Sequence, residues 1–355
     1  MKRNTTNFFI LLSFPLFFSC QKNSAQFFKA NNALIRYTGR IDLSDPAKPR
    51  FWQPGVYVEA VFEGASCQII VNDQQLWGDK QNYLQIVVDG KSHRIQTTGA
   101  TDTIEVASGL AEGQHTLLVC KNTEANIGWL EFGGLICKKL LPLPPAPERK
   151  MEFFGNSITC GTGADASQIP CGTGKWEDQH NAYLSYGPLT ARALHAQWHL
   201  SAVSGIGLIH SCCNMDVLMP QVFDNIEMRG DSLDWDFKKF QPDVVTICLG
   251  QNDGVQDSVA FCSAYVQFIE TLRRQYPNAQ IVCLTSPMAD GTLMPVLKNY
   301  LTGIVNFMNE KGDAKVDKFF FSRQFASGCD THPDLAEHGL IAGELTGFLK
   351  EKMGW

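Results

Sequence analysis

The sequence predicts two domains, an N-terminal all-β sandwich of jelly-roll type and a C-terminal three-layer α/β domain built on a parallel sheet. Three observations lead to this prediction. The chain has 355 residues, which is more than one ordinary domain needs. Four prolines fall within residues 141–147 and separate two halves of different pattern. Short strand-like runs with polar turns fill the first half, whereas apolar runs alternate with helical patterns in the second.

Residues 1–20 have the pattern of an export signal. Lys2 and Arg3 precede an apolar stretch at 8–18, which is too short to span a bilayer as a helix. The stretch ends at Ser19-Cys20, as in bacterial lipoprotein signals, where the cysteine becomes the lipidated first residue, although phenylalanine stands at 17 where leucine is usual. A simple cleaved signal peptide is the alternative. We therefore expect an exported protein, either an outer-membrane or cell-surface lipoprotein anchored through Cys20 or a periplasmic protein.

Residues 21–141 are expected to form the β-sandwich. The turn signal Asp89-Gly90 is typical of a hairpin, and almost no helical period appears in this region. Short strands at regular spacing favour a sandwich. This half carries no catalytic constellation, so we expect a structural partner or a carbohydrate-facing module. The strand-like runs lie at 56–62, 67–72, 83–88, 103–107, 115–120 and 129–132.

Residues 142–149 are expected to be a linker, because closely spaced prolines fit neither a helix interior nor a central strand. Residues 150–355 then alternate strands with helices. Strands that are apolar on both faces predict a parallel sheet covered on both sides, and such sheets carry function at the carboxyl ends of their strands. The strands are expected at 150–154, 198–203, 243–249 and 280–285, and helices at 183–196 and 260–276 and from about Leu335.

Composition and cysteine spacing argue against nucleic-acid and metal binding. A formal net charge of −6 without a basic stripe argues against a nucleic-acid partner. Cys212 and Cys213 have no second pair at zinc-ligand spacing, so we expect no metal, and nothing calls for a cofactor. Export permits disulfides, and Cys160 and Cys171 are close enough in sequence to bridge a loop.

Four short motifs follow the predicted strands of the second half or precede its last helix. They are the turn around Ser157, the glycine-rich turn 204–207, the segment 249–254 and the segment 329–333 with His332. Each motif alone is ordinary turn chemistry. Because the carboxyl ends of parallel strands share one edge of a sheet, the motifs together indicate a catalytic site there.

These four blocks resemble the SGNH hydrolase superfamily, the GDSL-type esterases and lipases, whose α/β domain is flavodoxin-like. Asn156 stands in the first block where aspartate is commoner. The resemblance implies that Ser157 is the nucleophile and His332 its general base. It also implies an oxyanion hole made of the Ser157 N–H, the Gly205 N–H and the Asn252 side-chain amide.

The acid member of the triad is where the sequence departs from the superfamily. The usual aspartate stands three residues before the histidine, and that position here is Cys329. Asp330 is one residue closer to His332. Two arrangements stay open: a shifted triad that uses Asp330, or a Ser–His dyad in which a backbone carbonyl orients the imidazole.

The sandwich ahead of this domain narrows the resemblance to carbohydrate esterase family two, the acetyl xylan esterase-like enzymes. That resemblance implies removal of O-acetyl groups from cell-wall polysaccharides such as xylan and glucomannan through an acyl-enzyme on Ser157. The partner would be an acetylated polysaccharide or oligosaccharide. Trp176 and Trp235 are candidates for a sugar-facing surface, with ordinary packing as the alternative.

Two other functions fit parts of the pattern. A lipase or lysophospholipase would use the same scaffold, but the polar, glycine-rich stretch 161–178 favours a hydrophilic substrate. A non-catalytic glycan-binding lipoprotein is the other alternative. The presence of Ser157, Gly205, Asn252 and His332 together argues against it.

Overall fold

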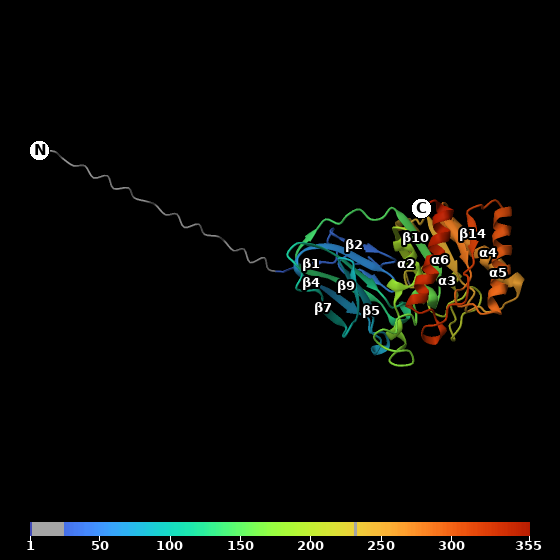
Figure 1. The fold of residues 1–355 in the computed structure, drawn as a ribbon, viewed down its shortest axis with the longest axis horizontal. Helices are drawn as coiled ribbons and strands as arrows, with labels where there is room; N and C mark the ends of the chain where they lie inside the picture. Colours follow the sequence, from blue (N-terminus) through green and yellow to red (C-terminus); the bar gives the residue numbers. More distant parts are fainter. Residues whose placement is uncertain (2–24, 231–232) are drawn as a thin grey trace.

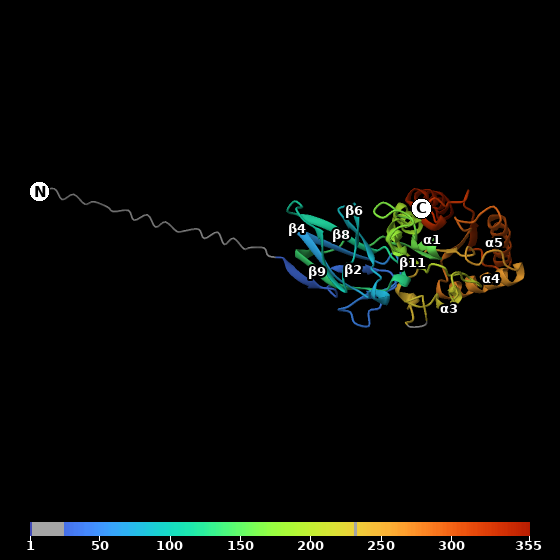
Figure 2. The same ribbon diagram turned by 90° about the horizontal axis from the view of Figure 1, so that it is seen from below.

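The computed structural model describes residues 1, 25–230 and 233–355. An antiparallel sandwich and a three-layer α/β domain lie side by side, as Figures 1 and 2 show from two directions. The predicted fold class is confirmed. Apart from Met1, the predicted export signal, including Cys20, lies outside the described residues. In the part of the chain that the structure describes, no helix is both long and apolar enough to cross a membrane.

Nine strands of the described residues form the sandwich, and β4 (Tyr57–Asp73) ties it together. Residues 57–63 pair with β8 and residues 67–72 with β7, while β9 pairs with parts of both halves. From Cys67 onward every second residue of β4 is buried, as expected for a strand with one face in a core. The other strands are β1 (Gln26–Lys29), β2 (Ile35–Thr38), β3 (Arg50–Phe51), β5 (Tyr83–Val88), β6 (Lys91–Gln96), β7 (Thr101–Ala107), β8 (Gln114–Lys121) and β9 (Leu130–Leu141).

The second sheet is parallel, with the strand order β11-β10-β12-β13-β14. Its strands are β10 (Arg149–Gly155), β11 (Ala196–Ala202), β12 (Val244–Cys248), β13 (Gln280–Leu284) and β14 (Val316–Phe319). The first four match the expected strands within two residues at either end. Residues 142–148 connect β9 to β10.

Helices cover both faces of this sheet. Val245 and Ile247 point into the core that α4 and α5 close, whereas Val244 and Cys248 point to the opposite core, closed by α2 and α6. This alternation is why the strands are apolar on both faces. The helices are α1 (Ser157–Cys160), α2 (Tyr186–Ala193), α3 (Met219–Val222), α4 (Ser258–Gln275), α5 (Leu293–Glu310) and α6 (Leu335–Met353). Helix α2 is shorter than the predicted 183–196, because residues 182–184 form a separate 3₁₀ turn and the chain enters β11 at Ala196.

The two domains share a buried interface. Arg40 of the sandwich forms an ion pair of 2.8 Å with Glu152 of β10, and both side chains are almost completely buried. The Trp198 ring stacks on Tyr57 with centroids 4.1 Å apart, and its Nε1 donates to the Gly55 carbonyl. Either charge would be strongly destabilising if it stayed buried without its partner, so the pair favours the docked arrangement of the two domains.

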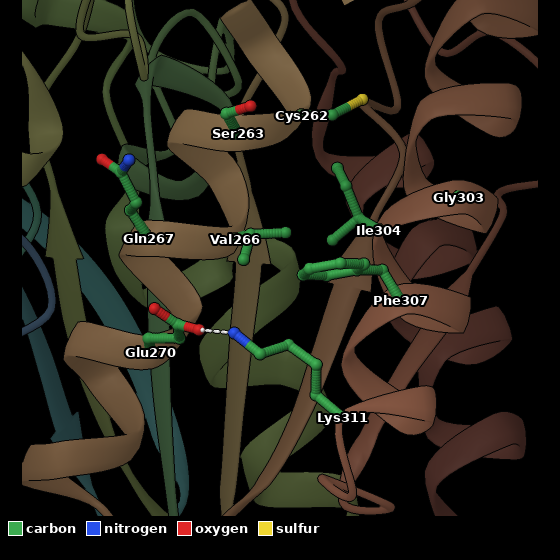
Figure 3. Close-up of a pocket in the computed structure, with 9 residues that line it drawn as sticks. All are labelled: Cys262, Ser263, Val266, Gln267, Glu270, Gly303, Ile304, Phe307 and Lys311. Atoms are coloured by element: carbon green, nitrogen blue, oxygen red, sulfur yellow. Dashed lines mark hydrogen bonds and ion pairs between the residues drawn. The ribbon is translucent and has the colours of Figure 1, made fainter. Parts of the chain in front are cut away.

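A groove of about 420 Å³ runs between the outer faces of α4 and α5. Val266, Ile304 and Phe307 line it, and an ion pair of 2.7 Å between Lys311 Nζ and Glu270 crosses one end (Figure 3). Cys262 lies at the other end. None of the lining residues belongs to the four motifs.

Candidate active site

Ser157 is the first residue of α1, and only Asn156 separates it from the end of β10. Asn156 caps this helix, and its side-chain oxygen accepts a hydrogen bond of 3.3 Å from the Ile158 N–H. The first N–H groups of a helix have no partner within the helix, so the Ser157 N–H faces forward at the positive end of the helix dipole. Only 8% of Ser157 is exposed. The local fold therefore presents both a hydroxyl and an amide at one point.

The His332 imidazole lies beside the Ser157 hydroxyl. Its Nε2 lies 2.8 Å from the Ser157 Oγ, and its Nδ1 lies 3.2 Å from the backbone carbonyl of Cys329. A carbonyl oxygen only accepts, so Nδ1 carries the proton and Nε2 is left to accept from the serine hydroxyl. Burial lowers the pKa of His332 below its ordinary value of 6.5. The ring is therefore neutral at pH 7 and available as a base.

Asp330 does not occupy the acid position of a triad in this geometry. The residue is exposed, and the Nδ1 of His332 is already paired with the Cys329 carbonyl. The negative charge of Asp330 acts on the ring only as a nearby charge. It raises the pKa of His332, but the opposite effect of burial is larger. Of the two arrangements that the sequence leaves open, the protein has the geometry of the second, a histidine oriented by a backbone carbonyl.

Gly205 and Asn252 follow β11 and β12, the two strands beside β10. Gly205 has a positive φ of 85°, a conformation that glycine adopts without strain. The Asn252 Nδ2 donates to the Ile206 carbonyl at 2.8 Å, which ties the two loops together. An amide nitrogen carries two hydrogens, so the second remains for a substrate oxygen.

Two buried carboxylates hold these loops. Asp253 accepts hydrogen bonds from the N–H groups of Leu208, Ile209 and His210, at 2.7 to 3.1 Å. Glu124 reaches across from the sandwich, and its Oε2 accepts from the Ser204 N–H at 2.6 Å. Burial raises the pKa of Glu124, and the bond from Ser204 opposes that shift. Sequence reasoning missed Glu124, because no motif marks a residue that acts across a domain interface.

The two tryptophans have different surroundings. Trp176 is 39% exposed and lines a cleft of about 710 Å³ beside Gly205. Trp235 is 6% exposed, with its ring beside His199 and the Arg40 guanidinium. A buried ring has no face to offer a sugar, so the structure favours ordinary packing for Trp235. The cleft is also lined by Asn126, Asn214, Asp216 and Arg229.

The cysteines pair differently from the sequence expectation. Cys171 is bonded to Cys329, and Cys212 to Cys213. The bridge between Cys160 and Cys171 does not form, because the buried thiol of Cys160 lies on α1 and faces Glu124. In residues 1, 25–230 and 233–355, no group of three or more acidic, histidine or cysteine side chains is arranged to hold a metal.

Both domains of the chain match known protein families. Residues 37–147 match the carbohydrate esterase 2 N-terminal domain, and residues 153–316 match the GDSL-like lipase/acylhydrolase family. A solved family two carbohydrate esterase from Clostridium thermocellum, in complex with cellohexaose, is 37% identical to the chain with a TM-score of 0.82. The match covers 90% of this chain and 99% of that one. The chain belongs to carbohydrate esterase family two.

Other similar proteins agree. A family two carbohydrate esterase structure from Cellvibrio japonicus is 26% identical, with a TM-score of 0.84 over 94% of this chain and 99% of that one. An acetylxylan esterase/glucomannan deacetylase of Cellvibrio japonicus is 26% identical over 98% of both chains. Cellulase/esterase CelE of Acetivibrio thermocellus is 37% identical over 92% of this chain, which spans only 40% of CelE. The resemblance to SGNH hydrolases and to family two is therefore confirmed.

Proposed function

We propose that this family two member is a serine esterase that removes O-acetyl groups from cell-wall polysaccharides such as xylan and glucomannan. The observation that carries the proposal is the contact of 2.8 Å between Ser157 Oγ and His332 Nε2 at the edge of the parallel sheet. The names of the Cellvibrio japonicus relatives, acetylxylan esterase/glucomannan deacetylase, support the substrate class.

The reaction begins when His332 Nε2 removes the Ser157 proton and Oγ attacks the acetyl carbonyl carbon. An unassisted serine hydroxyl is a weak nucleophile at neutral pH, so the imidazole is required. The protonated ring then gives its proton to the departing sugar oxygen, which leaves an acetyl group on Ser157. Water, activated by the same ring, attacks this acyl-enzyme and releases acetate.

Negative charge develops on the carbonyl oxygen in both steps. The N–H groups of Ser157 and Gly205 and the second amide hydrogen of Asn252 are the donors assigned to it. Such donors stabilise the transition state by about 3–4 kcal/mol each. The carbonyl of Cys329 keeps the imidazole oriented by accepting a hydrogen bond from Nδ1–H throughout, so the machinery works as a dyad without a carboxylate.

The cleft favours a carbohydrate over a lipid. Four polar side chains of its mixed lining, Asn126, Asn214, Asp216 and Arg229, suit a hydroxylated chain, and Trp176 offers an exposed ring face for a sugar. A lipase or lysophospholipase would need a long apolar groove at this place. A purely glycan-binding role has no need of a serine and an imidazole held within hydrogen-bonding distance.

The test is acetate release from acetylated xylan, acetylated glucomannan and a long-chain ester, with Ser157→Ala as the matched control. We expect release from the polysaccharides, little from the long-chain ester, and a loss of turnover of about 10⁴-fold or more in Ser157→Ala. Preference for the long-chain ester would favour a lipase. Release by Ser157→Ala at the wild-type rate would reject the esterase mechanism.

We also propose that the chain is exported and anchored through Cys20 as a lipoprotein of the outer membrane or cell surface, with a periplasmic location as the alternative. The Cys171–Cys329 disulfide supports export, because disulfides persist in oxidising compartments. Metabolic labelling with palmitate tests the anchor: the wild type should take up label, and Cys20→Ser should not. Equal labelling of both proteins would reject lipidation at Cys20.

A further inference from the structure

The histidine lies at the end of a tight turn. The His332 N–H donates to the Cys329 carbonyl at 3.1 Å, so residues 329–332 form a β-turn. Both central residues are left-handed, with φ of 51° at Asp330 and 60° at Thr331. A type I′ turn requires this conformation but usually places asparagine, aspartate or glycine there, and a β-branched threonine is an outlier. The turn does not form from local preference alone.

This turn sets the position of the imidazole. The carbonyl of Cys329 accepts two hydrogen bonds, one from the His332 backbone N–H at 3.1 Å and one from its ring Nδ1 at 3.2 Å. A shift of that carbonyl moves both the backbone and the ring of the histidine. Ring Nε2 would then lose its contact of 2.8 Å with the Ser157 hydroxyl.

Two connections fix Cys329 itself. Its N–H donates to the Gly163 carbonyl at 2.9 Å, and its sulfur is bonded to Cys171. The approach to Gly163 is close, since a Cβ added there would lie 2.6 Å from the Cys329 carbonyl oxygen. The disulfide joins residues 158 positions apart and is the one covalent tie between this turn and the segment after the nucleophile.

The Cys171 end of the bridge is anchored on the sandwich. Asp178, a few residues on, accepts from the Tyr83 hydroxyl at 2.9 Å, and Glu177 pairs with Lys80 at 3.0 Å. Within the loop, the Gln179 Nε2 donates to the Thr173 carbonyl at 3.0 Å. Cys171 therefore sits on a supported loop, so the disulfide can hold the turn in place. Cys171 is exposed, which lets a thiol reagent reach it.

We propose that the Cys171–Cys329 disulfide is a positioning element for His332, holding the backbone carbonyl that does the work of the missing acid. The proposal rests on the proposed esterase function. It follows that reduction of this one bond lowers turnover and makes the enzyme thiol-sensitive.

The first experiment compares the wild type with the Cys171→Ser/Cys329→Ser double variant on p-nitrophenyl acetate. We expect kcat to fall about 10- to 100-fold, as for a misplaced catalytic group, with KM changed less than about twofold. Burial is the largest influence on the pKa of His332, so water entering the freed turn should move the acidic limb of the pH profile upward toward 6.5. Circular dichroism confirms that the variant is folded.

The second experiment needs no substitution at the bridge. One dithiothreitol molecule supplies two electrons and two protons, converts the disulfide into two thiols and is itself oxidised to a cyclic disulfide. Wild-type kcat should fall on reduction to the level of the double variant, and the double variant should not respond. Cys212→Ser/Cys213→Ser removes the other disulfide and should still lose activity by the same factor on reduction.

Cys262→Ser is the matched control, because Cys262 is a free thiol in the α4–α5 groove (Figure 3), outside the catalytic machinery. Its turnover should equal that of the wild type before and after reduction. If the folded double variant keeps wild-type kcat and pH profile, the positioning role is rejected. If wild-type protein hydrolyses no acetyl ester at all, it is the proposed function that fails, so the two failures are distinguishable.

Discussion

The two sides of the nucleophile are held by different means. On the base side, a disulfide and a tight turn fix the carbonyl that orients His332. On the oxyanion side, hydrogen bonds to Asp253 and Glu124 fix the loops of Gly205 and Asn252. A covalent tie holds one side, whereas buried carboxylates hold the other. The base side should therefore be sensitive to thiols, and the oxyanion side to loss of a single acceptor.

Both sides depend on the sandwich. It supports the Cys171 loop through Tyr83 and Lys80, and it supplies Glu124 to the Ser204 N–H. The sandwich carries no member of the dyad, yet it contacts the segments on either side of it. We therefore expect the N-terminal domain to position the catalytic residues.

The largest effect on the oxyanion side is expected for Asn252→Ala. Removal of one oxyanion donor costs about 10²- to 10³-fold in kcat. The amide also donates to the Ile206 carbonyl, so the loops loosen as well. Steady-state kinetics on p-nitrophenyl acetate measures this. A change below about threefold would remove Asn252 from the oxyanion hole.

A smaller effect is expected at Glu124, where the sandwich acts. Glu124→Ala leaves the buried Ser204 N–H without its acceptor, and we expect kcat to fall about tenfold, in line with the energy of a hydrogen bond to a charged group. Glu124→Gln keeps a side-chain oxygen at the same place and is the matched control, with an intermediate rate. If alanine and glutamine behave alike, the acceptor is not what matters.

The pH profile tests the base side without any substitution. His332 must be neutral to accept the serine proton, and burial lowers its pKa below 6.5. Activity should therefore be kept as the pH falls through 6.5 and be lost only when the pH drops through the lower pKa. The acidic limb of kcat/KM reports this value for the free enzyme. A limb at or above 6.5 would contradict a buried base.

The smallest effect is expected for Asp330→Asn. The side chain is exposed and the ring Nδ1 is already paired with a backbone carbonyl, so kcat should stay within about twofold of wild type. Asparagine also tolerates the left-handed conformation of this position, which protects the turn. A severe loss of kcat would instead support the shifted triad, in which Asp330 is the acid member.

What the sequence could predict depends on how local the information is. Ser157, Gly205 and Asn252 each lie in a short motif after a strand, so the parallel strands bring them to one edge of the sheet, and His332 lies in a short motif before the last helix. The ring of Trp235, by contrast, is indistinguishable in sequence from that of Trp176. Only packing shows that one is buried and the other lines the cleft.

The residues that support the site could not be predicted from the sequence, because their partners are distant along the chain. Glu124 lies 80 residues before its partner Ser204, and the two meet only through the domain interface. Cys171 and Cys329 are 158 residues apart, and sequence proximity favoured Cys160 instead. Pairing across such separations is set by tertiary structure, which no local pattern encodes.

During turnover Ser157 is expected to carry the acyl group, and this covalent intermediate can be located directly. Acid quench during turnover of p-nitrophenyl acetate, followed by peptide mass spectrometry, locates any covalent acetyl group. We expect one acetyl group on the peptide that contains Ser157, and neither adduct nor turnover in Ser157→Ala. An acetyl group on another residue, together with turnover retained in Ser157→Ala, would contradict this expectation.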